Sequence, residues 1–185
     1  MLEDGEIATA PLRTARQTDT IVLSGDGVEV WEPSFTYHGF RYVQLDGWPA
    51  ETELSSDAVT GIVINSDMRE ISSFESSSGM LNKLHQNIRW SMRSNFMSIP
   101  TDCPQRDERL GWTGDAHSFA STANFLYDTT GFWKAWLKDV CSEQVKGMPQ
   151  NIHQTSARSF PTLQSPLFGD SLHLFLFCIV ITRPG

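Results

Sequence analysis

Carboxylates, arginines and a tryptophan are concentrated in one short segment, residues 101–115 (TDCPQRDERLGWTGD). Its fifteen residues include Asp102, Asp107, Glu108, Asp115, Arg106, Arg109 and Trp112. Glycoside hydrolysis needs one carboxylic acid to protonate the leaving oxygen and a second carboxylate to activate water or to attack. It also needs polar groups that hold sugar hydroxyls and an apolar face for the ring. The segment can supply the acid and the groups that hold the sugar.

The same charges also have a structural explanation. Acidic residues are favoured at a helix N-terminus, so Asp107 and Glu108 could stabilise a following helix. Arg106 and Arg109 could then pair with them on the surface. Residue types and spacing leave both interpretations open.

Helical periodicity flanks the charged segment on both sides. Before it, apolar residues recur at spacings of three and four: Leu81, Leu84, Ile88, Met92 and Phe96. After it, two further stripes follow: Ala116, Phe119, Ala120 and Ala123, then Phe132, Trp136 and Val140. We therefore expect three helices between about residues 72 and 147, with these stripes in a core and residues 76–78 as N-caps. Pro100 and Pro104 keep a helix from running through 98–107, which is expected to be a loop.

Residues 1–66 have the composition of a β region. Strands are expected at 20–23, 35–45 and 59–65, with a turn at 24–27 (SGDG). Gly39, inside the second of these, predicts a bulge or a close approach of another backbone. Three strands suggest part of a sandwich but are too few to close one.

The segment DCPQRDERLGWTGD resembles the signature of the bacterial and fungal α-L-rhamnosidases that have a six-hairpin, (α/α)6 catalytic barrel. The flanking sequences are similar to that family too. WEPSFTYHGFRYVQLDG resembles the end of the β-sandwich domain that precedes the barrel, and SSFESSSGMLNKLHQNIRWSMRSNFMSIPTDCPQRDERLGWTGDA resembles the linker and opening helices. FLYDTTGFWKAWLKDVCSEQVKGMPQNI resembles the next hairpin, so the likeness covers roughly residues 2–152.

The resemblance implies an α+β fragment, in which the C-terminal part of a β-sandwich is followed by the first helices of an (α/α)6 barrel. Residues 1–66 would be the partial, concanavalin-like sandwich and residues 67–153 the N-terminal part of the six-hairpin catalytic domain. From residue 154 the helical stripes stop, and an isolated apolar cluster follows near the end. Residues 154–185 are therefore expected to be an atypical tail, disordered or non-native.

The resemblance also implies roles for individual residues. Glu108 matches the general acid, with the adjacent Asp107 as its rival. Asp102 matches a carboxylate that binds rhamnose hydroxyls, and Trp112 an aromatic that lines the sugar pocket. A further acidic contact falls on Asp115, and Arg106 would orient the carboxylates.

The family inverts configuration, which requires a general base about 6.5–9.5 Å from the acid to leave room for water. In the family this base is a glutamate far downstream, whereas no glutamate follows Glu143 in this sequence. The implied function is hydrolysis of terminal non-reducing α-L-rhamnose from glycosides or polysaccharides, with this chain an incomplete and inactive piece. A non-catalytic carbohydrate-binding piece and a truncated product without function are the alternatives.

The resemblance implies a rhamnose-containing glycoside or polysaccharide as the partner. A net charge of −8 with dispersed basic residues argues against a nucleic acid. The apolar run at 172–181 is about half the roughly 20 residues that a membrane span needs. The five histidines show no HxxxH or HExxH spacing, so we expect no metal and no cofactor.

Three widely spaced cysteines are expected to be buried or semi-buried thiols: Cys103, Cys141 and Cys178. Residues 1–6 show no signal peptide pattern. Cytoplasmic and secreted locations both stay open, and so does the oligomeric state.

Overall fold

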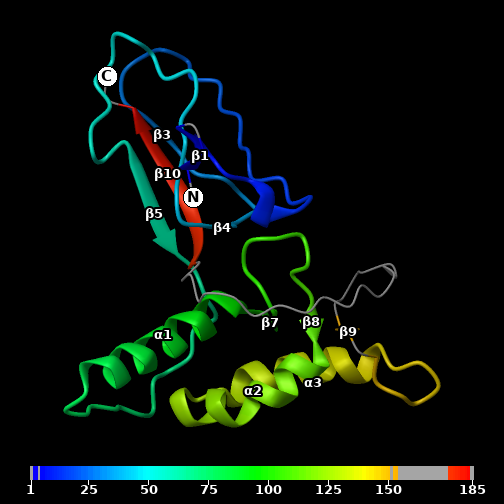
Figure 1. Ribbon diagram of the computed structural model, residues 1–185. Coiled ribbons are helices and arrows are strands. Elements are labelled where there is room, and N and C mark those ends of the chain that lie inside the picture. The colour runs from blue at the N-terminus through cyan, green and yellow to red at the C-terminus, as the bar shows by residue number, and fades with distance from the viewer. Residues whose placement is uncertain (1, 4, 151, 154–174, 184–185) are drawn as a thin grey trace. The chain divides into compact units, whose positions relative to one another are not determined.

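The computed structural model describes residues 2–3, 5–150, 152–153 and 175–183 (Figure 1). The chain forms two compact units. The N-terminal unit comprises residues 1–64, 104–107 and 174–185, and the helical unit comprises residues 65–103 and 108–173. Strands and helices are both present, in agreement with the predicted α+β class.

A four-stranded antiparallel sheet forms the centre of the N-terminal unit. Strand β10 (Phe175–Arg183) pairs with β3 (Glu29–Trp31) and β4 (His38–Phe40) at its two ends, and with β5 (Val59–Val63) along its middle. Ile181 pairs with both Trp31 and Val59, so β5 lies on the opposite edge of β10 from β3. The short pair β1 (Leu2–Glu3) and β2 (Glu6–Ile7) and a 3-10 turn at Ala10–Leu12 precede this sheet.

The strand expected at residues 20–23 is absent from the structure. Val22 is 92% exposed and has no ladder partner among the described residues. A β-branched sequence forms a strand only where another strand offers an edge, and propensity alone does not supply one. The turn expected after it is present: Gly25 and Gly27 have φ of 90° and 65°. The carboxylate of Glu29 accepts hydrogen bonds from the backbone N–H and the hydroxyl of Ser24 at 2.7 and 2.8 Å.

The strand expected at 35–45 is confined to β4, because β10 pairs only with its residues 38–40. Phe35 has a φ of 61°, which breaks extended backbone ahead of the strand. The third predicted strand is confirmed as β5. Only one four-stranded sheet is described, so the structure contains part of a sandwich at most.

Within its described residues, the helical unit contains three helices, as the periodicity predicted: α1 (Gly79–Asn95), α2 (Thr113–Leu126) and α3 (Thr130–Ser142). Ser78 occupies the N-cap position of α1 but makes no side-chain capping bond. Instead the Ser76 N–H donates to Asn82 Oδ1 at 2.8 Å, and Asn82 Nδ2 donates to the Ser76 carbonyl at 2.9 Å. Figure 1 shows α2 and α3 as successive helices of one hairpin, joined by residues 127–129.

Phe96, at the end of α1, is the centre of the larger hydrophobic cluster. Its ring stacks on Phe132 with centroids 4.6 Å apart and meets Trp133 edge-on at 5.5 Å. The other buried members are Met92, Ala123, Leu126 and Tyr127, and a second cluster contains Ala116, Trp136 and Val140. The predicted core faces of α2 and α3 are confirmed at these positions.

The core prediction is wrong for the first turns of α1. Leu81 and Leu84 are 45% and 53% exposed. Of the predicted stripe, only Ile88, Met92 and Phe96 contact the larger cluster, because α2 and α3 pack against the last turns of the helix.

Of the atypical tail expected at 154–185, disordered or non-native, the structure describes residues 175–183, and these nine residues form β10. The remainder of that prediction lies outside the described residues. Among the helices that the structure describes, none is long and apolar enough to cross a membrane.

Candidate functional site

The charged segment forms a loop whose two ends are held together. Thr101 and Gly111 make an isolated antiparallel bridge. Thr101 is buried, and its N–H donates to the Asn95 carbonyl, the last residue of α1, at 2.9 Å. Gly111 belongs to β8 (Gly111–Trp112), which leads directly into α2 and pairs with β9 (Ile152–His153). The loop therefore starts and ends on the helical unit.

A tight hairpin directly precedes this loop in the chain. β6 (Phe96–Met97) pairs with β7 (Ile99–Pro100), and the chain reverses at Ser98, which has a φ of 63°. The Ser98 N–H donates to Ser66 Oγ at 2.9 Å. Residues 98–107 contain no helix, as Pro100 and Pro104 predicted.

Cys103 contacts both Asp102 and Glu108. Its thiol is buried, with 6% of the residue exposed. The sulfur lies 3.5 Å from Oδ1 of Asp102 and 3.7 Å from the carbonyl oxygen of Glu108. Asp102 and Glu108 are both partly buried. Two of the predicted site residues therefore adjoin one buried sulfur.

Trp112 and Asp115 sit at the start of α2. Trp112 is partly buried, and its indole Nε1 is buried with no hydrogen-bond acceptor within the described part of the chain. Asp115 is exposed in the first turn, where a carboxylate is favoured by the helix dipole. Asp107 and Glu108 precede the first helical residue, Thr113, by at least five positions, so the helix-capping explanation of those two acids is wrong.

Residues 104–107 group with the N-terminal unit. Asp107 is exposed, and its Oδ2 accepts a hydrogen bond from the hydroxyl of Thr14. That hydrogen bond is the main cause that lowers the pKa of the Asp107 carboxyl. A carboxyl with a lowered pKa is ionised at neutral pH and is a poor proton donor. Arg106 is partly buried in the same segment.

Sequence reasoning missed several residues around the loop. For Cys103 the sequence predicts a buried or semi-buried thiol, and its burial confirms this. Its place next to Asp102 in the sequence did not indicate a role at the site. Thr14 and Gln17 gave no signal, because their partners lie far along the chain. Cys141 is exposed, against the expectation of a buried or semi-buried thiol, and the Cys178 side chain lies outside the described residues. In the described chain, no group of three or more His, Cys, Asp or Glu residues is arranged to hold a metal ion.

Two family models match the chain. Residues 1–65 match the concanavalin-like domain of bacterial α-L-rhamnosidases, and residues 69–162 match their six-hairpin glycosidase domain. The second match extends nine residues into the segment that the sequence set apart as a tail. The two matches therefore fall on two different domains of one family of glycosidases. The chain belongs to the α-L-rhamnosidase family.

Named relatives agree with this assignment. The chain is 50% identical over 141 residues to an α-L-rhamnosidase of Streptomyces avermitilis, covering 76% of this chain and 14% of the relative. It is 47% identical to one from Formosa agariphila, covering 76% and 15% of the two chains. The chain therefore spans about a seventh of the length of these curated relatives.

Two solved structures are similar to the chain. The native α-L-rhamnosidase of Aspergillus terreus superposes with a TM-score of 0.73 at 66% identity, covering 78% of this chain and 17% of that one. The Streptomyces avermitilis enzyme complexed with L-rhamnose superposes with a TM-score of 0.79 at 45% identity, covering 85% and 15%. The predicted family is confirmed.

Proposed function

We propose that this chain carries the acid side of an inverting site that hydrolyses terminal non-reducing α-L-rhamnose from glycosides or polysaccharides. One observation carries the proposal. The buried Cys103 sulfur adjoins both the Asp102 carboxylate and the Glu108 backbone, in a loop whose ends are joined at Thr101 and Gly111. Family membership indicates that the sugar is rhamnose, because the relatives are named α-L-rhamnosidases.

Each residue has a defined part in the reaction. Glu108 donates its proton to the glycosidic oxygen as the bond from that oxygen to C1 of rhamnose breaks. A water molecule forms the new bond to C1 from the opposite face and loses its proton to a general base. The products are L-rhamnose with inverted anomeric configuration and the free alcohol of the leaving group.

Binding and orientation come from the neighbours of the acid. Asp102 accepts hydrogen bonds from rhamnose hydroxyls, with Asp115 as a further acidic contact and Arg106 orienting the carboxylates. Trp112 provides an apolar wall for the methyl-bearing side of the sugar. A buried donor such as the Trp112 N–H is expected to have an acceptor, and a sugar hydroxyl is one group that can act as one.

Asp107 competes with Glu108 for the role of acid, and its environment disfavours it. The Thr14 hydroxyl donates to Asp107 and lowers its pKa, which keeps that carboxylate ionised. The resemblance implies a downstream glutamate as the general base, and no glutamate follows Glu143 in these 185 residues. The three helices are, on this proposal, the first of an (α/α)6 barrel that brings the base to the opposite face of the sugar.

Replacement of the matching 141 residues of the Streptomyces avermitilis relative by the corresponding part of this chain tests the role of Glu108. Glu108→Gln in that hybrid should lower kcat for an alkyl α-L-rhamnoside by about 10²–10⁴, the usual contribution of a general acid. The loss for p-nitrophenyl α-L-rhamnoside should be much smaller, because p-nitrophenolate leaves without needing a proton. Asp107→Asn is the matched control and should keep activity on both substrates.

The same comparison can contradict the assignment of Glu108 as the acid. If Asp107→Asn, rather than Glu108→Gln, shows the loss that depends on the leaving group, then Asp107 is the acid. A folded hybrid that cleaves neither substrate would contradict the proposed function itself.

A non-catalytic rhamnose-binding piece is the second candidate, favoured by the Trp112 N–H that has no acceptor among the described residues. The 185-residue chain should then bind L-rhamnose, with chemical-shift changes at Trp112, and should release no nitrophenol from p-nitrophenyl α-L-rhamnoside. Release of nitrophenol by the 185-residue chain would instead place a complete site within it.

A further inference from the structure

Segment 104–107 of the charged loop is held at three points by residues from the first forty positions of the chain. The contacts come from Thr14, Gln17 and Gly39, all in the N-terminal unit together with the segment that they hold. None of these residues is among those that the family resemblance assigns a role.

The first point is a close approach of two backbones at Gly39. Gly39 is buried in β4, and a Cβ added there would lie 2.5 Å from the carbonyl oxygen of Pro104 and 2.7 Å from its carbonyl carbon. Real Cβ atoms essentially never approach other heavy atoms this closely. The obstructing atoms belong to the backbone, so no side-chain rotation can relieve the clash. The close backbone approach predicted at Gly39 is thereby confirmed, with Pro104 as the partner.

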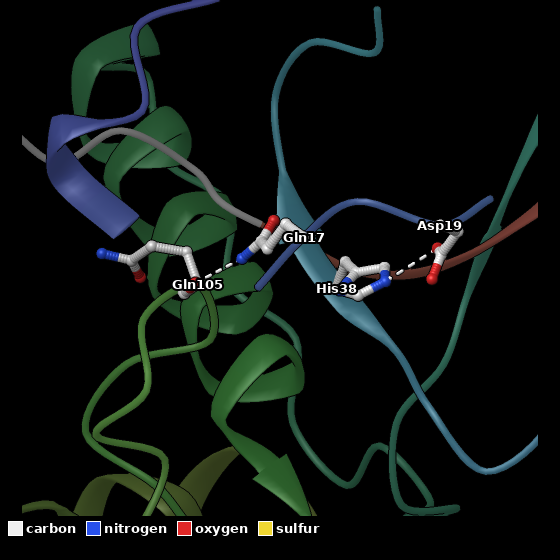
Figure 2. Close-up of polar contacts among 4 residues, drawn as sticks. All are labelled: Gln17, Asp19, His38 and Gln105. Carbon is white, nitrogen blue, oxygen red and sulfur yellow. Dashed lines mark hydrogen bonds and ion pairs between the residues drawn. The ribbon is translucent and has the colours of Figure 1, made fainter. Parts of the chain in front are cut away.

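The other two points are hydrogen bonds. Gln17 Nε2 donates to the carbonyl oxygen of Gln105, and the Thr14 hydroxyl donates to Oδ2 of Asp107 (Figure 2 shows the first of these). Thr14 bonds to Asp107 and Gln17 bonds to Gln105, so residues 14–17 run antiparallel to residues 105–107. Together with Gly39, they hold three of the four residues in the segment.

The segment that provides these donors is itself fixed to β4. His38 is buried, and its Nε2 lies 2.9 Å from Oδ2 of Asp19 (Figure 2). His38 directly precedes Gly39. Two consecutive residues of one strand therefore hold the donor segment and limit how far Pro104 can move.

We propose that Thr14, Gln17 and Gly39 are positioning residues, which fix the conformation of the segment 104–107 that leads directly into Glu108. The inference rests on the proposed role of Glu108. Consecutive Cα atoms are about 3.8 Å apart, so a displacement of Asp107 is passed directly to Glu108. Misplacement of a reacting group by about 1 Å can cost on the order of 10²-fold in rate.

Cys103 reports on the position of this loop without any need for turnover. Its sulfur is buried against Asp102 and the Glu108 carbonyl, whereas Cys141 is exposed on α3. In the 185-residue chain, the alkylation rate of each cysteine can be followed by peptide mass spectrometry, with Cys141 as the internal standard. Gly39→Ala should raise the Cys103 rate by at least about tenfold and leave the Cys141 rate unchanged, as expected for a local opening.

Gly131→Ala is the matched control, since a Cβ at Gly131 meets nothing within 4 Å. It should change neither rate. A Cys103 rate in Gly39→Ala that stays within about twofold of the wild type would overturn the proposal, because the loop would not have opened.

Thr14 offers a milder variant that avoids a backbone clash. Thr14→Val should raise the pKa of Asp107 toward its ordinary value in a carboxyl ¹³C titration and should also speed alkylation of Cys103. Thr14→Ser keeps the hydroxyl and should restore both properties. If Thr14→Val changes neither, the hydroxyl contact does not hold the segment and the proposal fails.

The hybrid with the Streptomyces avermitilis relative separates positioning from general stability. Gly39→Ala there should lower kcat for the alkyl rhamnoside more than for the p-nitrophenyl rhamnoside, with little change in KM. An equal loss on both substrates would overturn the positioning role. A third outcome is that Gly39→Ala speeds Cys103 alkylation, but Asp107→Asn, rather than Glu108→Gln, shows the loss of kcat that depends on the leaving group. The contacts of segment 104–107 would then stand, and Glu108 would not be the acid.

Discussion

The guanidinium of Arg89, on α1, donates a hydrogen bond to the carboxylate of Glu70, which precedes the helix in the chain. Glu70 also makes an isolated β-bridge with Tyr127, whose hydroxyl donates to the same carboxylate oxygen at 3.4 Å. The Arg89 hydrogen bond is the largest cause that lowers the pKa of Glu70. This carboxylate therefore links α1 to the residue that directly follows α2.

The Glu70–Arg89 pair should make the stability of the helical unit depend on pH. Because the folded-state pKa of Glu70 is below the ordinary value of 4.5, its contribution is fully present above that pH and is lost as pH falls through the lowered pKa. The side chains are 46% and 33% exposed, so Glu70→Gln should cost only about 0.5–1 kcal/mol at pH 7. Urea unfolding of both proteins should show this difference at pH 7 and a smaller one near pH 3.

Glu75→Gln is a suitable control for that comparison, since Glu75 is exposed a few residues further along. It should change stability by less than about 0.5 kcal/mol at either pH. A Glu70→Gln penalty of equal size at both pH values would show that the charge of Glu70 contributes nothing.

Phe96 should be the most sensitive position of the larger cluster. Its ring contacts Phe119, Phe132 and Trp133, and only 4% of the residue is exposed. Phe96→Ala should cost about 3–5 kcal/mol, because it removes buried apolar surface and leaves a cavity. Thermal unfolding followed by far-ultraviolet circular dichroism would measure the loss.

Leu84→Ala provides the comparison within the same helix stripe. Leu84 is 53% exposed, so its truncation should cost less than about 0.5 kcal/mol. Equal penalties at Phe96 and Leu84 would mean that the first turns of α1 are packed as tightly as the last.

Strand β10 should control the stability of the N-terminal sheet. Every ladder partner that β5 has among the described residues lies on β10. A chain ending at residue 173 should therefore show faster amide exchange at Val59–Val63, by at least about tenfold, with α2 unaffected. A chain ending at residue 183 is the control. Unchanged protection of β5 after the longer deletion would show that another element protects it.

The helices could be predicted from the sequence because their signal is local. The spacing of four between Met92 and Phe96, or between Phe132 and Trp136, marks one face of a helix wherever the helix lies. Exposure of Leu84 could not be foreseen, because it depends on how far the neighbouring helices extend along α1.

The strands were harder to predict for the opposite reason. β3, β4 and β5 are short, and each pairs with a segment near the far end of the chain, which no local pattern reveals. At the candidate site, the types and spacing of the residues left a glycosidase site and a structural role both open, and only the resemblance to a family signature favoured the first. Gly39 indicated a close backbone approach, but nothing in the sequence named Pro104 as the other backbone.

The contacts of segment 104–107 bear on where recombination could divide such chains. Domain boundaries usually fall where few contacts cross, and residue 65 would look like such a boundary. Recombination there would nevertheless separate four residues, in the middle of the segment that resembles the family signature, from Thr14, Gln17 and Gly39. The residues on the two sides of position 65 are therefore expected to be inherited together.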